Sequence, residues 1–190
     1  GAGTTSNGYT IWWGTNGSTQ ADDTYTGNTP DDPNAGDVIS FTNNSFSIGQ
    51  NSYSQIYLQS NGWCRFTSGS TAYSDSYSSF RGDHSIAVPW EDRNFETNPD
   101  DVQSISYKET SDQFIIIFDT EGYNNDHEIQ TQVTLNLDNH SSPGNITYDF
   151  GTINTNTRGL IGISFGSNSP SDQSETDLST LTTETTFTYP

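Results

Sequence analysis

The sequence predicts an all-β protein: an antiparallel β-sandwich of about nine to twelve strands, with little or no helix and with extended terminal arms. Three observations predict this fold class. Ser, Thr and Asn make up 71 of the 190 residues, and these residues suit turns and solvated strand faces but not helix interiors. Apolar residues recur at every second position in short runs, as they do in half-buried strands. Gly, Asn, Pro and Ser separate those runs at short intervals.

The two terminal segments, residues 1–36 and 166–190, are expected to lie outside the main body. Tyr9–Trp13 is a short apolar run between glycine-rich flanks, which predicts a strand. Residues 14–37 are polar and acidic, and a stretch of this length is unusual for a loop inside a compact domain. We therefore expect an N-terminal strand arm followed by an acidic linker. The C-terminal tail is polar until Phe187–Tyr189, which predicts a last strand or an extended arm.

A β-sandwich body is expected over residues 37–165. Asn61-Gly62 stands between two strand-like runs, and this dipeptide predicts a two-residue β-hairpin. Phe114–Phe118 is a continuous apolar run, which predicts a central strand buried on both faces. Ile129–Leu137 keeps one face over nine residues, which predicts a strand with one buried face. The other strand-like runs are Val38–Phe41, Phe46–Ile48, Ile56–Leu58, Trp63–Phe66, Ile86–Trp90, Val102–Tyr107, Ile146–Phe150 and Leu160–Phe165.

An ordered set of motifs runs through this body. Ile56–Trp63 contains Ser-Asn-Gly followed by Trp, Ile86–Asp92 ends in Pro-Trp-Glu-Asp, and Gly144–Tyr148 reads Gly-Asn-Ile-Thr-Tyr. Together with the core strands between them, these motifs resemble those of nidogen-type (NIDO-like) domains over residues 37–165. The resemblance implies an all-β extracellular module used for binding or architecture, and it brings no catalytic residues with it.

The charge balance excludes several classes of partner. Asp and Glu number 24 against 5 Lys and Arg, which gives a formal net charge of -19. A protein this acidic repels nucleic-acid phosphates and anionic membranes, and the sequence has no apolar run long enough to span a membrane. We therefore expect no nucleic-acid partner and no membrane insertion. Two explanations account equally well for the negative net charge: adaptation to salty water and dedicated metal binding.

No catalytic site is predicted, so we expect a non-enzymatic protein. The three histidines, His84, His127 and His140, all have acids and hydroxyls nearby, as this composition dictates, and no Gly-x-Ser-x-Gly elbow occurs. The single cysteine, Cys64, lies in a strand-like run and is expected to be a buried structural thiol. Paired carboxylates that could hydrolyse glycosides are instead expected to be solvated turn residues: Glu91, Asp92, Asp119, Glu121, Asp126 and Glu128.

Calcium is the one metal that the acidic loops suit. Hard cations take several carboxylate and carbonyl oxygens as ligands. Asp119, Glu121, Asp126 and Glu128 bracket an Asn-rich loop between two core strands. A calcium site at these four residues is therefore one hypothesis. The alternative interpretation is that they are ordinary acidic loop residues. We expect no other cofactor.

Aromatic residues raise the alternative of carbohydrate binding by stacking. Trp12 and Trp13 are adjacent, and neighbouring side chains in a regular strand face opposite ways. One of the two indoles would then need a second partner, either a sugar or a neighbouring subunit. The other aromatic candidates are Trp63, Tyr73, Tyr77 and Phe80.

Several short motifs occur that chance also explains. Arg81-Gly82-Asp83 matches an integrin-binding tripeptide, and its glycine alone would account for a turn. N-glycosylation sequons matter only if the protein is made where glycosylation occurs. They begin at Asn16, Asn43, Asn139 and Asn145.

The N-terminal strand predicts how the protein is used. Tyr9, Ile11, Trp12 and Trp13 must complete a sheet, either that of their own chain or a neighbour's. Adding a strand to another subunit builds fibres, and head-to-tail contacts that do not close make open filaments. We predict a secreted structural or adhesive subunit at a cell or virion surface, whose partners are copies of itself or another surface protein. The alternative is a carbohydrate- or calcium-dependent, lectin-like adhesin module.

Overall fold

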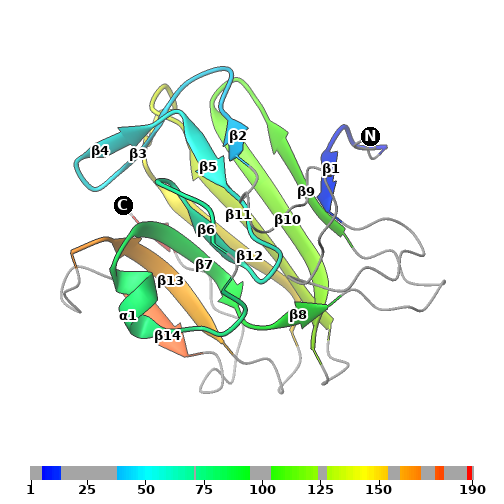
Figure 1. Ribbon diagram of the computed structural model, residues 1–190. Coiled ribbons are helices and arrows are strands. Elements are labelled where there is room, and N and C mark those ends of the chain that lie inside the picture. Colours follow the sequence, from blue (N-terminus) through cyan, green and yellow to red (C-terminus); the bar gives the residue numbers. More distant parts are fainter. Residues whose placement is uncertain are drawn as a thin grey trace.

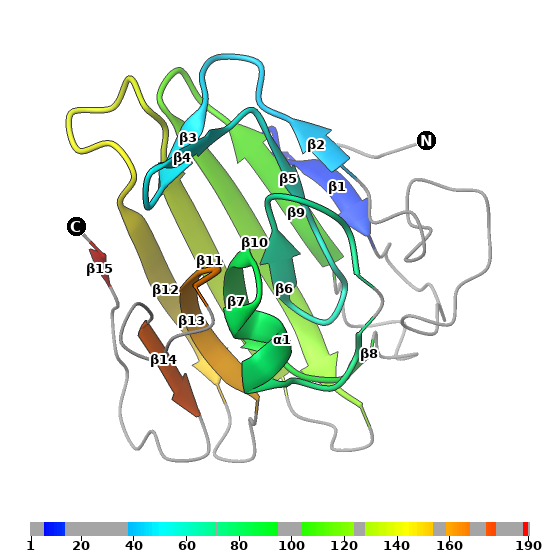
Figure 2. The same ribbon diagram turned by 60° about the vertical axis from the view of Figure 1, so that its left-hand side comes forward.

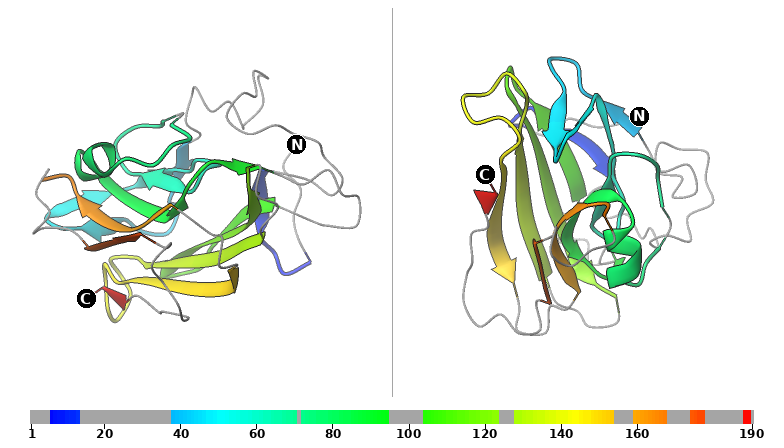
Figure 3. Two further views of the ribbon diagram at one scale, coloured as in Figure 1. Left: turned by 90° about the horizontal axis from the view of Figure 1, so that it is seen from below. Right: turned by 90° about the vertical axis from the view of Figure 1, so that its left-hand side faces the viewer.

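The computed structural model describes residues 6–13, 38–70, 72–94, 104–123, 128–153, 159–167, 174–177 and 188–189. These residues form antiparallel sheets and one short helix (Figure 1), which confirms the predicted all-β, sandwich-like fold class. The two larger sheets face each other as separate layers, as Figure 3 shows. Among the described residues, no helix is long and apolar enough to cross a membrane.

Seven strands of the described chain form the first sheet. Their order is β1 (Thr10–Trp13), β9 (Ser104–Glu109), β10 (Gln113–Gly122), β11 (Glu128–Asn136), β12 (Ile146–Ile153) and β15 (Thr188–Tyr189), and β8 (Arg93–Asn94) also pairs with β10. The first and last strands, β1 and β15, therefore lie at opposite edges of one sheet (Figure 2). Both terminal segments thus contribute strands to the sheets of the body.

The second sheet has six strands in the described residues. Their order is β14 (Ser174–Asp177), β13 (Leu160–Phe165), β7 (His84–Trp90), β6 (Trp63–Arg65), β5 (Gln55–Tyr57) and β2 (Val38–Ser40). A separate hairpin consists of β3 (Phe46–Ile48) and β4 (Asn51–Tyr53). The strand count exceeds the nine to twelve expected because several strands have only two or three residues.

The main core lies between the two sheets. The alternation over Ile129–Leu137 is confirmed, since its five inward-facing residues are buried. The run Phe114–Phe118 is central in its sheet, as predicted, but it is buried on one face only, because Ile115 and Ile117 are half-buried. On the other face of the sheet, Ile115 and Ile117 lie beside the polar residues Thr134 and Gln132 of β11. The face therefore alternates apolar and polar side chains across these two strands.

The second sheet is buried on both faces along its central strand β7, in which every residue from Ser85 to Trp90 is buried. Its outer face carries a second apolar cluster, in which the rings of Trp63 and Trp90 stack with centroids 4.1 Å apart. The helix α1 (Tyr77–Arg81) contributes the fully buried Phe80 to this cluster. The Trp90 indole N–H donates to the Ala72 carbonyl at 3.1 Å, which fastens the preceding loop over the sheet.

The hairpin between β5 and β6 differs from the prediction. Its connection is Leu58–Gly62 and not the two residues Asn61-Gly62. The turn closes where the Gly62 N–H donates to the Gln59 carbonyl at 3.0 Å. Asn61 is fully buried, and its Oδ1 accepts the Arg93 N–H at 2.8 Å. The strands end early because this turn bends into the protein, where the Asn61 and Gly62 carbonyls accept the backbone N–H groups of Glu91 and Val88.

Substituting Gly62 with alanine should destabilise the fold far more than substituting Gly49. Both glycines have positive φ, +84° and +60°, and an L residue there loses about 1–2 kcal/mol. A Cβ on Gly62 would also meet the backbone carbonyl oxygens of Pro89 and, at 2.6 Å, Val88, whereas one on Gly49 would meet only the Phe165 ring at 3.4 Å.

Chemical denaturation should therefore give a loss of roughly 3 kcal/mol or more for Gly62→Ala and about 1 kcal/mol for Gly49→Ala. Equal losses would show that the close packing at Gly62 does not matter.

Candidate functional site

A buried arginine joins the two sheets at the end where β7 leads into β8. The Arg93 side chain is fully buried. Its Nη1 donates to the Thr120 hydroxyl of β10 at 3.0 Å, and its Nη2 donates to the Val88 and Pro89 carbonyls of β7. The guanidinium also lies 5.2 Å from the centre of the Phe118 ring. The arrangement is a structural tie between the layers.

Electrostatics keep this arginine charged. Burial lowers the pKa of Arg93 to about 10, while the Glu91 carboxylate and Cys64 oppose that shift. The guanidinium therefore stays protonated at neutral pH, and Glu91 is itself buried nearby. Sequence reasoning missed this residue, because nothing in the local pattern around Arg93 predicts that its side chain is buried.

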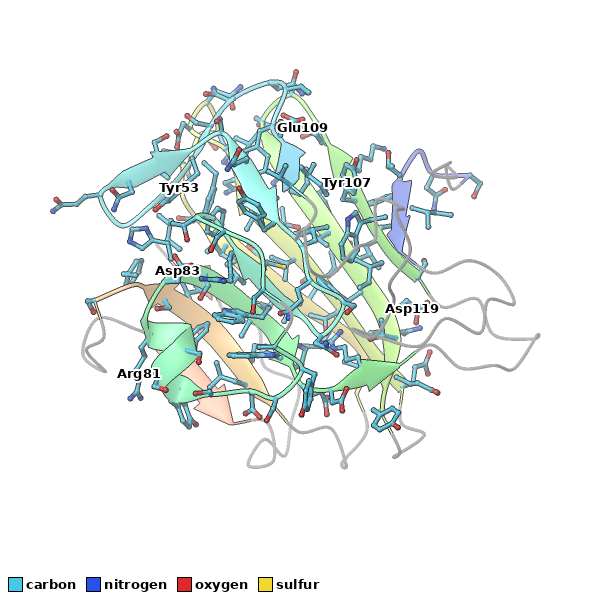
Figure 4. The ribbon with its side chains drawn as sticks, in the orientation of Figure 1. Tyr53, Arg81, Asp83, Tyr107, Glu109 and Asp119 are labelled. Atoms are coloured by element: carbon cyan, nitrogen blue, oxygen red, sulfur yellow. The ribbon has the colours of Figure 1, made fainter. Side chains whose placement is uncertain are left out.

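The residues predicted to bind calcium lie at the same end of β10 as Arg93, since Glu121 and Gly122 pair with β8; Figure 4 labels Asp119 there. Asp119 pairs with Gln130, and Glu121 pairs with Glu128, across β10 and β11. The Gln130 amide donates to Glu128 Oε1 at 2.7 Å and to Asp119 Oδ1 at 3.3 Å. Asp126 lies outside the described residues. No three His, Cys, Asp or Glu side chains in the described part of the chain gather as a metal-binding group, so calcium binding stays a prediction.

The candidate sugar-binding aromatics divide into two groups. Trp63 and Phe80 are buried in the outer apolar cluster, so the expectation that their rings are available for stacking is wrong. Tyr73 and Tyr77 are 54% and 43% exposed, so these two alone among the four loop and hairpin candidates could meet a sugar. The Arg81 guanidinium already lies 5.0 Å from the centre of the Tyr77 ring.

The Arg81-Gly82-Asp83 tripeptide does not present its carboxylate to solvent. Arg81 ends α1, and Gly82 is the C-terminal cap. The Asp83 carboxylate accepts Arg65 Nε at 2.8 Å and the Thr67 hydroxyl at 2.6 Å, and only 10% of its side chain is exposed. Figure 4 shows Arg81 and Asp83 on either side of the helix end. An integrin-type ligand needs a free aspartate, so the structure argues against that use.

The two described histidines hydrogen-bond other groups of the protein. His84 Nδ1 hydrogen-bonds the Tyr53 hydroxyl, and burial, followed by the Asp83 charge, raises the pKa of Tyr53. His140 Nδ1 accepts the Ser142 N–H at 3.0 Å. His127 lies outside the described residues. The absence of catalysis therefore remains a prediction from the sequence.

Two of the sequons lie close to one another. Asn43 and Asn139 are both exposed. Their side-chain amides donate to the neighbouring carbonyls of Thr110 and Ser111, at 2.7 Å and 2.8 Å. Asn145 is half-buried, and Asn16 lies outside the described residues. Glycosylation of any of them stays a prediction.

The predicted assembly strand pairs within its own chain. Strand β1 runs antiparallel to β9, with Thr10 opposite Tyr107 and Ile11 opposite Ser106. A register shift follows between Ile11 and Trp13, and such a bulge breaks the strict alternation expected of the two tryptophans. Trp12 packs against the main core, while the Trp13 side chain is not among those described. Exchange of this strand between chains stays a prediction.

Comparison with known proteins adds no relatives. No family model matches the chain, and no curated protein or solved structure matches it. The resemblance to nidogen-type domains is therefore still a prediction, and function has to be argued from the geometry.

The buried Cys64 should make stability fall above pH 9. The thiol is fully buried, as predicted, and burial raises its pKa from 9.0 to about 12. The folded state keeps the proton where the unfolded state loses it, so this contribution is complete below pH 9 and is lost as the pH rises toward 12.

Denaturation curves between about pH 8 and pH 11 should show little loss below about pH 9 and, above about pH 10, a loss approaching about 1.4 kcal/mol per pH unit that Cys64→Ala removes. Tyr148, whose pKa burial raises well above 10.0, and Arg93 are present in both proteins, but Cys64 contributes to the pKa shift of each. The difference between the two proteins therefore reports the thiol together with its coupling to these two groups. Identical slopes for the two proteins would rule out a buried neutral thiol.

Proposed function

We propose that the protein is a non-enzymatic, extracellular structural subunit that assembles with copies of itself by exchanging its N-terminal strand. The observation that carries the proposal is the position of β1. This four-residue strand lies at a sheet edge of the described chain, paired with β9 alone. It can leave without disturbing any other described strand pairing.

The length of chain after β1 makes exchange geometrically feasible. Residues 14–37 separate Trp13 from Val38. A segment of 24 residues can span at most about 80 Å, whereas a small domain is about 30 Å across. The β1 segment of one copy can therefore reach the β9 edge of another.

Exchange would restore every contact that it breaks. A departing β1 removes Trp12 from the core and leaves β9 as an open edge, and an open edge readily accepts another strand. The same segment of a second copy would make the same pairing and bury the same indole. Strand exchange of this kind is a low-cost route to oligomers.

The charge of the subunit sets the conditions for assembly. Two copies of net charge -19 repel each other. Salt screens this repulsion over a distance of about 10 Å at 0.1 M. Assembly should therefore be favoured by salt, which agrees with a protein adapted to salty water.

Cross-strand disulfides distinguish exchanged from unexchanged β1. Cysteines replacing Ile11 and Ser106, which lie opposite each other on β1 and β9, should link neighbouring copies in assembled material. The matched control replaces Thr134 and Thr147, an opposite pair on β11 and β12 that exchange of β1 leaves within one chain. Both pairs lie within reach of a disulfide, and the native Cys64 is buried.

On non-reducing gels, oxidation should give covalent oligomers for Ile11→Cys/Ser106→Cys and crosslinked monomers for Thr134→Cys/Thr147→Cys. Crosslinked monomers from both pairs would mean that β1 stays in its own chain, and the proposal would be wrong.

A further inference from the structure

Lys108, the one lysine in the sequence, holds the segment that leads into β1. Its Nζ donates to the Asn7 backbone carbonyl at 3.1 Å and lies 5.6 Å from the centre of the Tyr9 ring. Figure 4 labels its neighbours Tyr107 and Glu109 on β9, the strand that lies beside β1. A single cationic side chain thus contacts two residues of the arm.

The turn at Gly8 brings both contacts to the lysine. Gly8 has φ +78°, and a Cβ there would lie 3.8 Å from Lys108 Nζ. This left-handed conformation, which glycine adopts without strain, allows the Asn7 carbonyl and the Tyr9 ring to meet the same ammonium group. Lys108 can therefore contact the N-terminal segment in this way only when the chain turns at Gly8.

The β1–β9 pairing needs such a contact to fix its register. Backbone hydrogen bonds between strands do not distinguish one sequence from another, and short strands slip unless side chains oppose it. β1 has only four residues and contains a register shift. Trp12, which is partly buried against the core, anchors the strand after the pair Thr10–Tyr107, and Lys108 anchors it before that pair.

We infer that Lys108 is the specificity-determining residue of the β9 edge: it selects the segment Asn7–Trp13 and sets the register of that segment on β9. In an assembly, the partner that fits the β9 edge is the same segment of a second copy. The second-copy part rests on the proposed function, whereas the local role of Lys108 does not. The segment has no charged side chain, so it approaches an acidic subunit without repulsion and offers the cation a carbonyl and an aromatic face.

The exchanged and unexchanged forms make the same Lys108 contact. Loss of the contact should therefore destabilise both forms alike and leave the final extent of assembly nearly unchanged. It should instead speed the opening of β1, and with it the rate of exchange. A variant that lacks the Lys108 contact should therefore change the rate of strand exchange and not the final extent of assembly.

The test uses the full chain and three variants. Lys108→Met keeps the aliphatic stem and removes the charge, and Lys108→Arg keeps a cation that can reach both partners. Arg81→Met is the matched control, since it removes a cation from an aromatic ring, Tyr77, away from β9. Amide hydrogen exchange of the peptide covering residues 6–13 reports the opening of β1 in each protein.

Amide hydrogen exchange of the 6–13 peptide should be faster in Lys108→Met by about threefold to tenfold, the size expected for losing a solvent-exposed contact of a cation. Lys108→Arg and Arg81→Met should match the parent protein. Unchanged exchange in Lys108→Met, or equal acceleration in Lys108→Arg, would overturn the inference.

A second readout separates this inference from the proposed function. Two batches of protein that carry different fluorescent labels are mixed. Energy transfer between the labels then reports how fast the subunits exchange β1. Faster mixing in Lys108→Met supports both ideas. If no protein forms mixed oligomers while hydrogen exchange still responds to Lys108, the proposed function fails and Lys108 remains the determinant of the β9 edge within one chain. Mixing at the parent rate would contradict the role of Lys108 in a second copy.

Discussion

The structure depends on one buried cation that ties its two layers together. A sandwich is held mainly by apolar contact between its sheets, and that contact has no direction of its own. Arg93 adds direction, because its guanidinium binds carbonyls of β7 and the Thr120 hydroxyl of β10 at the same time. A buried charge is tolerated only when it is well hydrogen-bonded, so the surrounding backbone has to bring its acceptors to this point. Gly62 leaves room for this arrangement, since a Cβ there would meet the Val88 carbonyl and the Arg93 guanidinium, and the neighbouring Asn61 holds the Arg93 backbone N–H.

The two edge strands of the first sheet come from the N-terminal and C-terminal segments. β1 covers β9, and β15 covers β12. An edge closed by a terminal strand can be closed equally well by the same strand of another molecule, so the feature that completes the monomer also allows a polymer. Trp12 provides apolar contact for this closure, and Lys108 provides its register. The proposed function therefore needs no surface beyond the one already occupied in the single chain.

The fold class could be predicted because it follows from local patterns. The alternation over Ile129–Leu137 is set by neighbours along the chain and is confirmed residue by residue. The sequence predicts a simple hairpin at Asn61-Gly62, because the partner of Asn61, Arg93, lies far along the sequence. It predicts burial of Phe114–Phe118 on both faces, because it does not show that β11 places polar residues beside Ile115 and Ile117. It does not predict the burial of Trp63 and Phe80, because the cluster that buries them is formed by residues far apart in the sequence.

The most direct test of strand exchange is the native mass and shape of the full chain. Both are measured by light scattering and negative-stain microscopy, at a salt concentration that screens the charge of the chain. Strand exchange predicts particles several times heavier than the 20.9 kDa chain, elongated because each copy gives β1 to the next. Compact particles with the mass of one chain at every protein concentration would contradict it.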